Sequence, residues 1–173
     1  MSAKRNDYIS KDDMYMTMAY IASLRSKDPN TQVGAVIVSD TDRILSVGYN
    51  GFPNGISDDD FPWNREADCE EDTKYPYVVH AEANAIMNFR GDNKALQSAT
   101  LYVTLFPCHE CTKMIIQSGI KKIVYKSNKY SRTADFREAK KMLDAVGIEC
   151  IQYDISKEES IKICKRIVSY FEI

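Results

Sequence analysis

Hydrophobic residues recur along the chain with two periods, which together predict helices alternating with strands. A spacing of three or four positions indicates amphipathic helices, and short apolar runs bounded by turn residues indicate strands. The expected helices span 11–26, 107–119, 134–147 and 157–171, with one more from about 80. The expected strands span 34–39, 44–50, 100–105, 121–126 and 148–154.

This order of elements predicts an α/β fold with one mixed five-stranded sheet and helices on both faces. The turn residues 40–43 join the first two strands into a hairpin. Strands that alternate with helices in the second half favour parallel pairing. With 173 residues and no composition break, we expect a single domain over 1–173.

A long segment, residues 50–77, is rich in Gly, Pro, Asn and Asp and carries neither period. An irregular loop of this length inside a compact domain is usually functional or disordered.

Composition and charge exclude several classes of function. The formal net charge of −2 leaves no broad basic surface, so neither nucleic acid nor anionic membrane is expected as a partner. No apolar run approaches the roughly 20 residues of a membrane span, and the first ten residues lack a signal peptide's apolar core. We expect a cytoplasmic protein, whose five cysteines are free thiols or metal ligands rather than disulfides.

Two of those cysteines, Cys108 and Cys111, form a C-x-x-C motif in the first turn of an expected helix. There the helix dipole lowers thiol pKa values, and two thiolates at this spacing suit zinc. A redox pair or two ordinary thiols are the alternatives. His80 begins another helix, and it can be a third ligand if the two helix starts meet at one sheet edge. A structural site needs a fourth ligand, and no spacing compels one among Cys69, His109, Cys150 and Cys164.

Glu82 follows His80 by two residues. Alone, it is explained as an acid favoured by the helix N-terminus. Beside zinc it has a second role, because zinc lowers the pKa of bound water and a carboxylate can pass that proton to a leaving group. The combination H-x-E with P-C-x-x-C is the signature of zinc deaminases acting on nucleobases.

The chain also resembles the deoxycytidylate (dCMP) deaminase family of animals and large DNA phages, over roughly residues 12–155. The segments that carry the likeness are RSKDPNTQVGAVIV, GYNGFPNG, DTKYPYVVHAEANAIMN and LFPCHECTKMIIQSGIKKIVY. The resemblance implies a three-layer α/β/α fold, one catalytic Zn²⁺ per chain and hydrolysis of dCMP to dUMP for thymidylate synthesis. It also implies a homo-hexamer, activated by dCTP with Mg²⁺ and inhibited by dTTP.

The same resemblance suggests which residues contact nucleotides. Arg25 and Tyr130 match positions that hold the 5′-phosphate, Asn50 one on the deoxyribose, and Ala81 is placed at the substrate. The regulatory nucleotide is expected at Asn50, Gly51, Asn54 and Gly55. Arginine does suit a phosphate. The alternatives are a surface charge for Arg25 and a simple Asn-Gly turn for Asn50.

Two rival functions stay open on the sequence. The first is deamination of another substrate: cytidine, dCTP, or a base in tRNA or single-stranded DNA. The acidic balance argues against a polynucleotide, which prefers a basic groove with stacking aromatic rings. The second is a zinc-stabilised binding module in which Glu82 is incidental.

Cys69 and His109 are expected at the surface, with His109 facing solvent.

Overall fold

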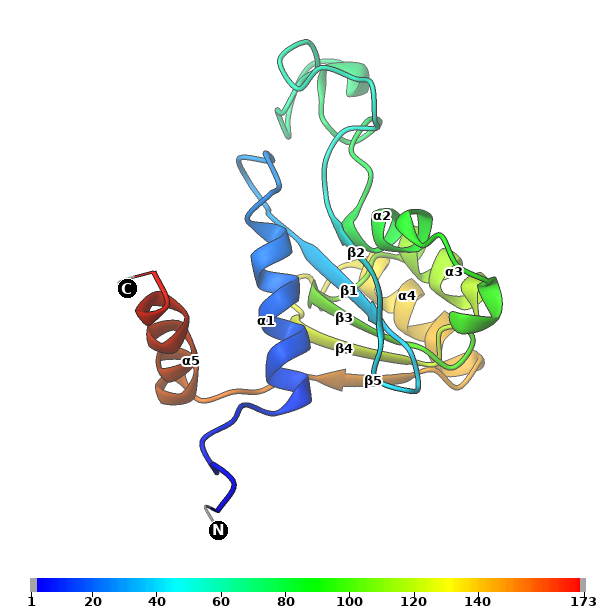
Figure 1. Cartoon of the computed structure of the whole chain (residues 1–173). Helices are drawn as coiled ribbons and strands as arrows, with labels where there is room; N and C mark the ends of the chain where they lie inside the picture. The colour runs from blue at the N-terminus through cyan, green and yellow to red at the C-terminus, as the bar shows by residue number, and fades with distance from the viewer. Residues whose placement is uncertain (1–2, 172–173) are drawn as a thin grey trace.

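Five strands form one mixed sheet in the order β2-β1-β3-β4-β5 (Figure 1). The structure is a computed structural model that describes residues 3–171. β1 pairs antiparallel with β2 and with β3, and the pairs β3–β4 and β4–β5 are parallel. The hairpin, the parallel half and the mixed sheet are therefore confirmed. The strands are Gly34–Val38, Ile44–Tyr49, Thr100–Leu105, Lys122–Ser127 and Glu149–Gln152.

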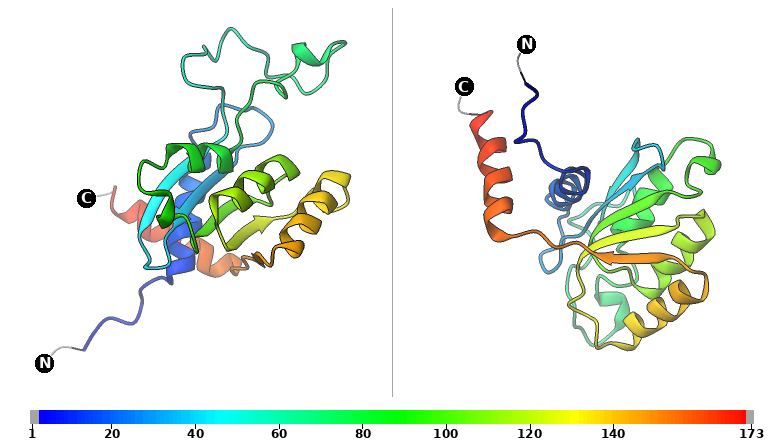
Figure 2. Two further views of the ribbon diagram at one scale, coloured as in Figure 1. Left: turned by 90° about the vertical axis from the view of Figure 1, so that its right-hand side faces the viewer. Right: turned by 90° about the horizontal axis from the view of Figure 1, so that it is seen from below.

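Helices cover both faces of this sheet, which confirms the three-layer fold (Figure 2). The helices α1 to α5 are Lys11–Ser23, Ala81–Asn88, His109–Ser118, Ala134–Ala145 and Lys157–Ser169, with single 3-10 turns at Glu70–Asp72 and Asn93–Ala95. α1 packs on one face, and α2, α3 and α4 pack on the other. α5 lies beyond α1, which separates it from the sheet (Figure 2). None of the helices described here is long and apolar enough to cross a membrane.

Alternating side chains of the central strands supply two cores. In β1, Ala35 and Ile37 face α2, α3 and α4, whereas Val36 and Val38 face α1. Every residue of β1 is buried, as expected for a strand covered on both sides. This explains why β1 appears in the sequence as an unbroken apolar run rather than as an alternating pattern.

Gly48 in β2 sets how closely α2 approaches the sheet. A Cβ atom at this position would lie 2.3 Å from the carbonyl oxygen of Ala81 and 2.3 Å from the amide nitrogen of Ala85. Only a glycine allows the backbone of α2 to lie directly against the strand. The start of α2 is thereby placed at the edge of the sheet where β3 ends.

The segment between β2 and α2 is an ordered loop that rises above the sheet (Figure 1). A two-residue bridge between Gly51 and Val79 closes its base through hydrogen bonds of 3.1 and 2.9 Å. Inside the loop, the rings of Phe52 and Trp63 lie 4.1 Å apart, centroid to centroid, and Phe61 packs against Tyr77 at 4.9 Å. The segment is therefore an ordered loop, held by backbone hydrogen bonds and aromatic contacts, rather than a disordered one.

Candidate active site

Two helices begin at one place, and three side chains with metal-binding atoms meet there. His80 is the N-cap of α2 and Cys108 is the N-cap of α3. Nδ1 of His80 lies 3.3 Å from Sγ of Cys108 and 3.5 Å from Sγ of Cys111. Cys108 follows the end of β3 by three residues, and α2 is held beside it by its contact with Gly48, so strand and helix packing assemble the group.

The donor set fits a tetrahedral zinc ion. Zn–S bonds of about 2.3 Å and Zn–N bonds of about 2.0–2.1 Å at tetrahedral angles separate such donor atoms by about 3.6 Å. The three ligand atoms lie within 4.8 Å of one another, and no fourth His, Cys, Asp or Glu of residues 3–171 joins them. Three protein ligands with one open position is the arrangement of catalytic zinc sites.

The carboxyl group of Glu82 is buried beside this group, with the residue 4% exposed. Burial raises its pKa to about 7, and the neighbouring Cys108 adds to this effect while His80 opposes it. Hydrogen bonding to Cys108 raises the pKa of His80 to about 9, and hydrogen bonding to Cys111 lowers the pKa of Cys108 to about 4. A carboxyl group whose pKa lies near neutrality can both accept and donate a proton.

The group opens into a pocket of about 780 Å³. His80, Glu82 and Cys108 contribute to its wall, together with the aromatic rings of Phe106 and Phe136. Polar and charged residues from the loop before β1, the loop after β2 and the segment after β4 line it as well: Thr31, Asn50, Arg65, Lys74, Tyr75, Asn128 and Tyr130. The pocket is thus partly apolar and partly polar, as a site for a heterocycle with a charged substituent requires.

Residues 9–127 match the family model for the cytidine and deoxycytidylate deaminase zinc-binding region. The chain belongs to this family. Deoxycytidylate deaminases of Pongo abelii and Homo sapiens are 44% and 43% identical to it over 169 residues, 98% of this chain and 90% of each relative. A crystal structure of the dCMP deaminase from cyanophage S-TIM5, in complex with dCMP and dUMP, superposes with a TM-score of 0.66 at 27% identity. That match covers 84% of this chain and 100% of the phage chain.

Asn50 and Tyr130 line this pocket, whereas Ala81 does not. Ala81 is fully buried in the core under α2, so its methyl group contacts protein. Asn50 is also largely engaged, since its Oδ1 accepts from the amide of Val33 at 2.8 Å and its Nδ2 donates to the carbonyl of Thr31 at 2.9 Å. Neither Asn50 nor Gly51 has a positive φ, which excludes the simple Asn-Gly turn.

Arg25 lies outside the deaminase pocket. This residue follows the last turn of α1 and lines a separate polar pocket of about 200 Å³, not the deaminase pocket. The second pocket also contains Lys27 and three residues expected at the regulatory nucleotide: Gly51, Asn54 and Gly55. Asn50 lines both pockets and therefore stands between them. The position of Arg25 in the sequence, shortly before β1, could not show which of the two pockets its side chain lines.

His109 is partly exposed to solvent and also contacts acidic side chains at the starts of two helices. Its side chain is 38% exposed, and its Nδ1 contacts the carboxylate of Asp135 in the first turn of α4. Its Nε2 lies 3.0 Å from Glu110. The contact with Asp135 raises the pKa of His109. The ring therefore links the starts of α3 and α4 beside the deaminase pocket.

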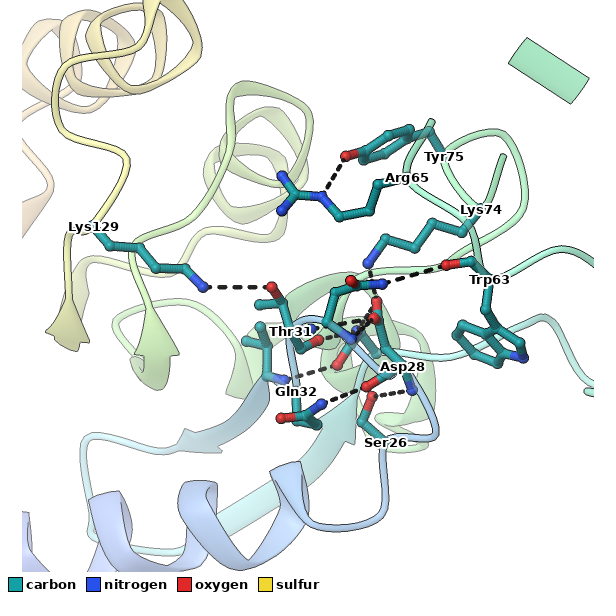
Figure 3. Close-up of polar contacts among 12 residues, drawn as sticks. Ser26, Asp28, Thr31, Gln32, Trp63, Arg65, Lys74, Tyr75 and Lys129 are labelled. Atoms are coloured by element: carbon teal, nitrogen blue, oxygen red, sulfur yellow. Dashed lines mark hydrogen bonds and ion pairs between the residues drawn. The ribbon is translucent and has the colours of Figure 1, made fainter. Parts of the chain in front are cut away.

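Sequence reasoning missed a buried ion pair in the pocket wall. The ammonium group of Lys74 contacts the carboxylate of Asp28, and the two side chains are 8% and 2% exposed (Figure 3). The same carboxylate accepts from the amides of Asn30 at 2.8 Å and Thr31 at 3.2 Å, and from Nδ2 of Asn50 at 3.3 Å. The only local signal was a lysine within the otherwise uncharged stretch 73–79.

Proposed function

We propose that this protein hydrolyses dCMP to dUMP and ammonia, with a zinc ion bound by His80, Cys108 and Cys111. The observation that carries the proposal is the buried Glu82 beside this three-ligand group, at the wall of a pocket that also contains polar and cationic side chains. The high identity to deoxycytidylate deaminases, over nearly the whole chain, supports dCMP as the substrate.

The residues divide the chemistry among them. Zinc bound at this site supplies a water of lowered pKa as the nucleophile. Glu82 would take a proton from the water and deliver it to N3 of the cytosine ring as the water oxygen bonds to C4. It would then take the second proton from the new C4 hydroxyl and pass it to the amine, so that the C4–N bond breaks, the C4 carbonyl forms and ammonia leaves. Burial raises the pKa of Glu82 above its usual value, which favours a carboxyl group that can hold a proton as well as accept one. The apolar rings of Phe106 and Phe136 limit water around the base and so strengthen these electrostatic interactions.

The test is a turnover assay with dCMP, deoxycytidine and dCTP, read by ammonia release. We expect dCMP to be the preferred substrate. Glu82→Gln keeps the shape of the side chain and removes proton transfer, so turnover should fall by at least the roughly 10²–10⁴-fold typical of a general acid–base group. A variant that keeps its zinc and more than a tenth of the wild-type rate would show that Glu82 has another role.

We further propose that the polar pocket binds the regulatory nucleotide, dCTP with Mg²⁺ as activator or dTTP as inhibitor, in a homo-hexamer. Support comes from Arg25 in its wall; Lys27 also lines the pocket but pairs there with the carboxylate of Asp58. A Cβ atom at Gly55 would meet no atom within 4 Å, so a phosphate has room to approach the backbone there. Asn50, shared by both pockets, offers a physical connection to the substrate.

Saturation curves with dCMP test this regulatory proposal. We expect sigmoidal curves that become hyperbolic with dCTP and Mg²⁺, a coupling typically worth about 5–150-fold in affinity. Arg25→Ala should remove the dCTP response and leave the rate at saturating dCMP near wild type. A hyperbolic curve that ignores both effectors, from a protein that is monomeric by light scattering, would remove the regulatory proposal and leave the catalytic one.

A further inference from the structure

The start of α3 is held by a side chain of another helix. The amide of His109 is the first of α3, and an amide at this place has no carbonyl of its own helix to bond. It donates to Oδ1 of Asp135, in the first turn of α4, at 3.2 Å. The same oxygen contacts Nδ1 of the His109 ring. The carboxylate of Asp135 thus lies at the starts of two helices, whose dipoles both favour a negative charge.

The hydrogen bond to the amide of His109 acts on the preceding residue, Cys108. The donated N–H belongs to the peptide that joins the two residues, and the orientation of this peptide depends on ψ of Cys108, which is 169°. A bond that fixes the peptide therefore also fixes the direction of the Cα–Cβ bond of Cys108. That direction decides whether Sγ of Cys108 reaches its place 3.3 Å from Nδ1 of His80.

The residue that follows Asp135 holds the other side of Cys108. The ring of Phe136 packs on the ring of Phe106, two residues before Cys108, with 4.6 Å between centroids. The start of α4 is itself well anchored, because Oγ1 of Thr133 accepts from the amide of Phe136 at 3.2 Å. Farther along the helix, two residues are buried in the core: Ala139 and Leu143. Two consecutive residues of α4 thus hold the chain before and after Cys108.

We propose that Asp135 is a positioning residue of the metal site, which holds Cys108 in the direction that lets its thiolate bind zinc. The inference rests on the zinc-dependent function proposed above. Asp135 is outside the group of ligand atoms, which comes from His80, Cys108 and Cys111. It acts through the backbone amide of His109, and the imidazole ring is not the route. Ligands oriented in advance lose less conformational freedom when the metal binds, so the site binds zinc more tightly.

Zinc affinity, measured by competition with a chromogenic chelator at constant pH, tests the proposal. Asp135→Ala should weaken zinc binding by about 10–100-fold, the usual effect of losing a group that orients a metal ligand. Asp135→Asn keeps an oxygen that can accept from the amide of His109 and should recover most of the affinity. His109→Ala removes the ring and keeps the amide, so its affinity should remain close to that of the wild type.

Glu138→Ala is the matched control. It removes a carboxylate of the same helix that lies 3.8 Å from Nδ1 of His109, and it leaves the amide of His109 bonded to Asp135. Its zinc affinity should equal that of the wild type.

The absorption spectrum of the Co²⁺-loaded protein separates positioning from general support of the fold, because the bands depend on the geometry of the ligands. In Asp135→Ala the bands should shift. A variant that is only less stable would unfold at lower urea and keep the wild-type spectrum while folded, which would overturn the proposal.

The other outcomes are equally distinct. Wild-type zinc affinity in Asp135→Ala would overturn this inference and leave the proposed function standing. Equal losses in His109→Ala and Asp135→Ala would overturn the route through the amide. Two zincs in the wild type, one of them lost in Asp135→Ala, would make Asp135 a ligand in the group it forms with His109 and Glu138. A wild type that binds no zinc would overturn the proposed function and this inference together.

Discussion

Replacement of Lys74 by methionine removes the ammonium group from the buried ion pair and keeps most of the aliphatic side chain. Asp28 is then a carboxylate without its cation, in a side chain that is 2% exposed. The pair joins the loop before β1, which contains Asp28, to the end of the loop between β2 and α2, which contains Lys74. Loss of the pair therefore weakens the attachment of both loops. We expect a lower free energy of unfolding and a pocket wall that is less well held.

The size of the loss follows from what Asp28 retains. Removing one partner of a buried ion pair typically costs about 3–5 kcal/mol. Here the carboxylate keeps two backbone amides and the amide of Asn50 as donors, at 2.8, 3.2 and 3.3 Å. These three hydrogen bonds continue to stabilise the charge, and we therefore expect the lower part of the range, about 2–4 kcal/mol.

Urea unfolding, followed by circular dichroism, measures the change. Lys27→Met is the matched control, because Lys27 pairs with Asp58 at the surface, with side chains 58% and 31% exposed. That pair should be worth no more than about 1 kcal/mol. In the double variant with Asp28→Asn, much of the loss from Lys74→Met should be recovered, since no uncompensated charge remains. A loss below about 1 kcal/mol for Lys74→Met, equal to the control, would refute the reasoning.

Three further predictions concern the metal, the packing of α2 and pH. Elemental analysis should find one zinc per chain in the wild type and far less in Cys111→Ser; two zincs or none in the wild type would contradict the ligand set. Gly48→Ala should destabilise the fold by about 1–3 kcal/mol in urea unfolding, because its methyl group collides with the backbone of α2. Gly51→Ala, which meets no neighbour, should stay within about 0.5 kcal/mol and serves as the control. Burial and a hydrogen bond to an aspartate raise the pKa of Tyr102 from 10.0, so the folded state keeps a proton that the unfolded chain releases. The free energy of unfolding should therefore fall above pH 10 by up to about 1.4 kcal/mol per pH unit. This slope should be smaller in Tyr102→Phe, and in the exposed control Tyr8→Phe it should equal that of the wild type.

Local patterns determined the elements and the metal-binding motif. The periods of apolar residues predicted all five helices and five strands, because each amphipathic element buries one face wherever it lies. Motif spacing also predicted which side chains would meet at the site: His80, Glu82, Cys108 and Cys111. This succeeded because each motif lies at the start of a helix, and two short local motifs contain all four groups.

Only the tertiary structure decided the rest of the pocket. Arg65, Lys74 and Tyr75 belong to a loop without a period, and their positions depend on Asp28, 46 residues before Lys74. Arg25 shows the opposite case, a charge near the site in sequence that faces another pocket. Hydrophobic periodicity reports which face of an element is buried, and it carries no information on where a long polar loop closes. That closure depends on a buried ion pair and an aromatic cluster between distant segments, and such contacts exist only once the chain has folded.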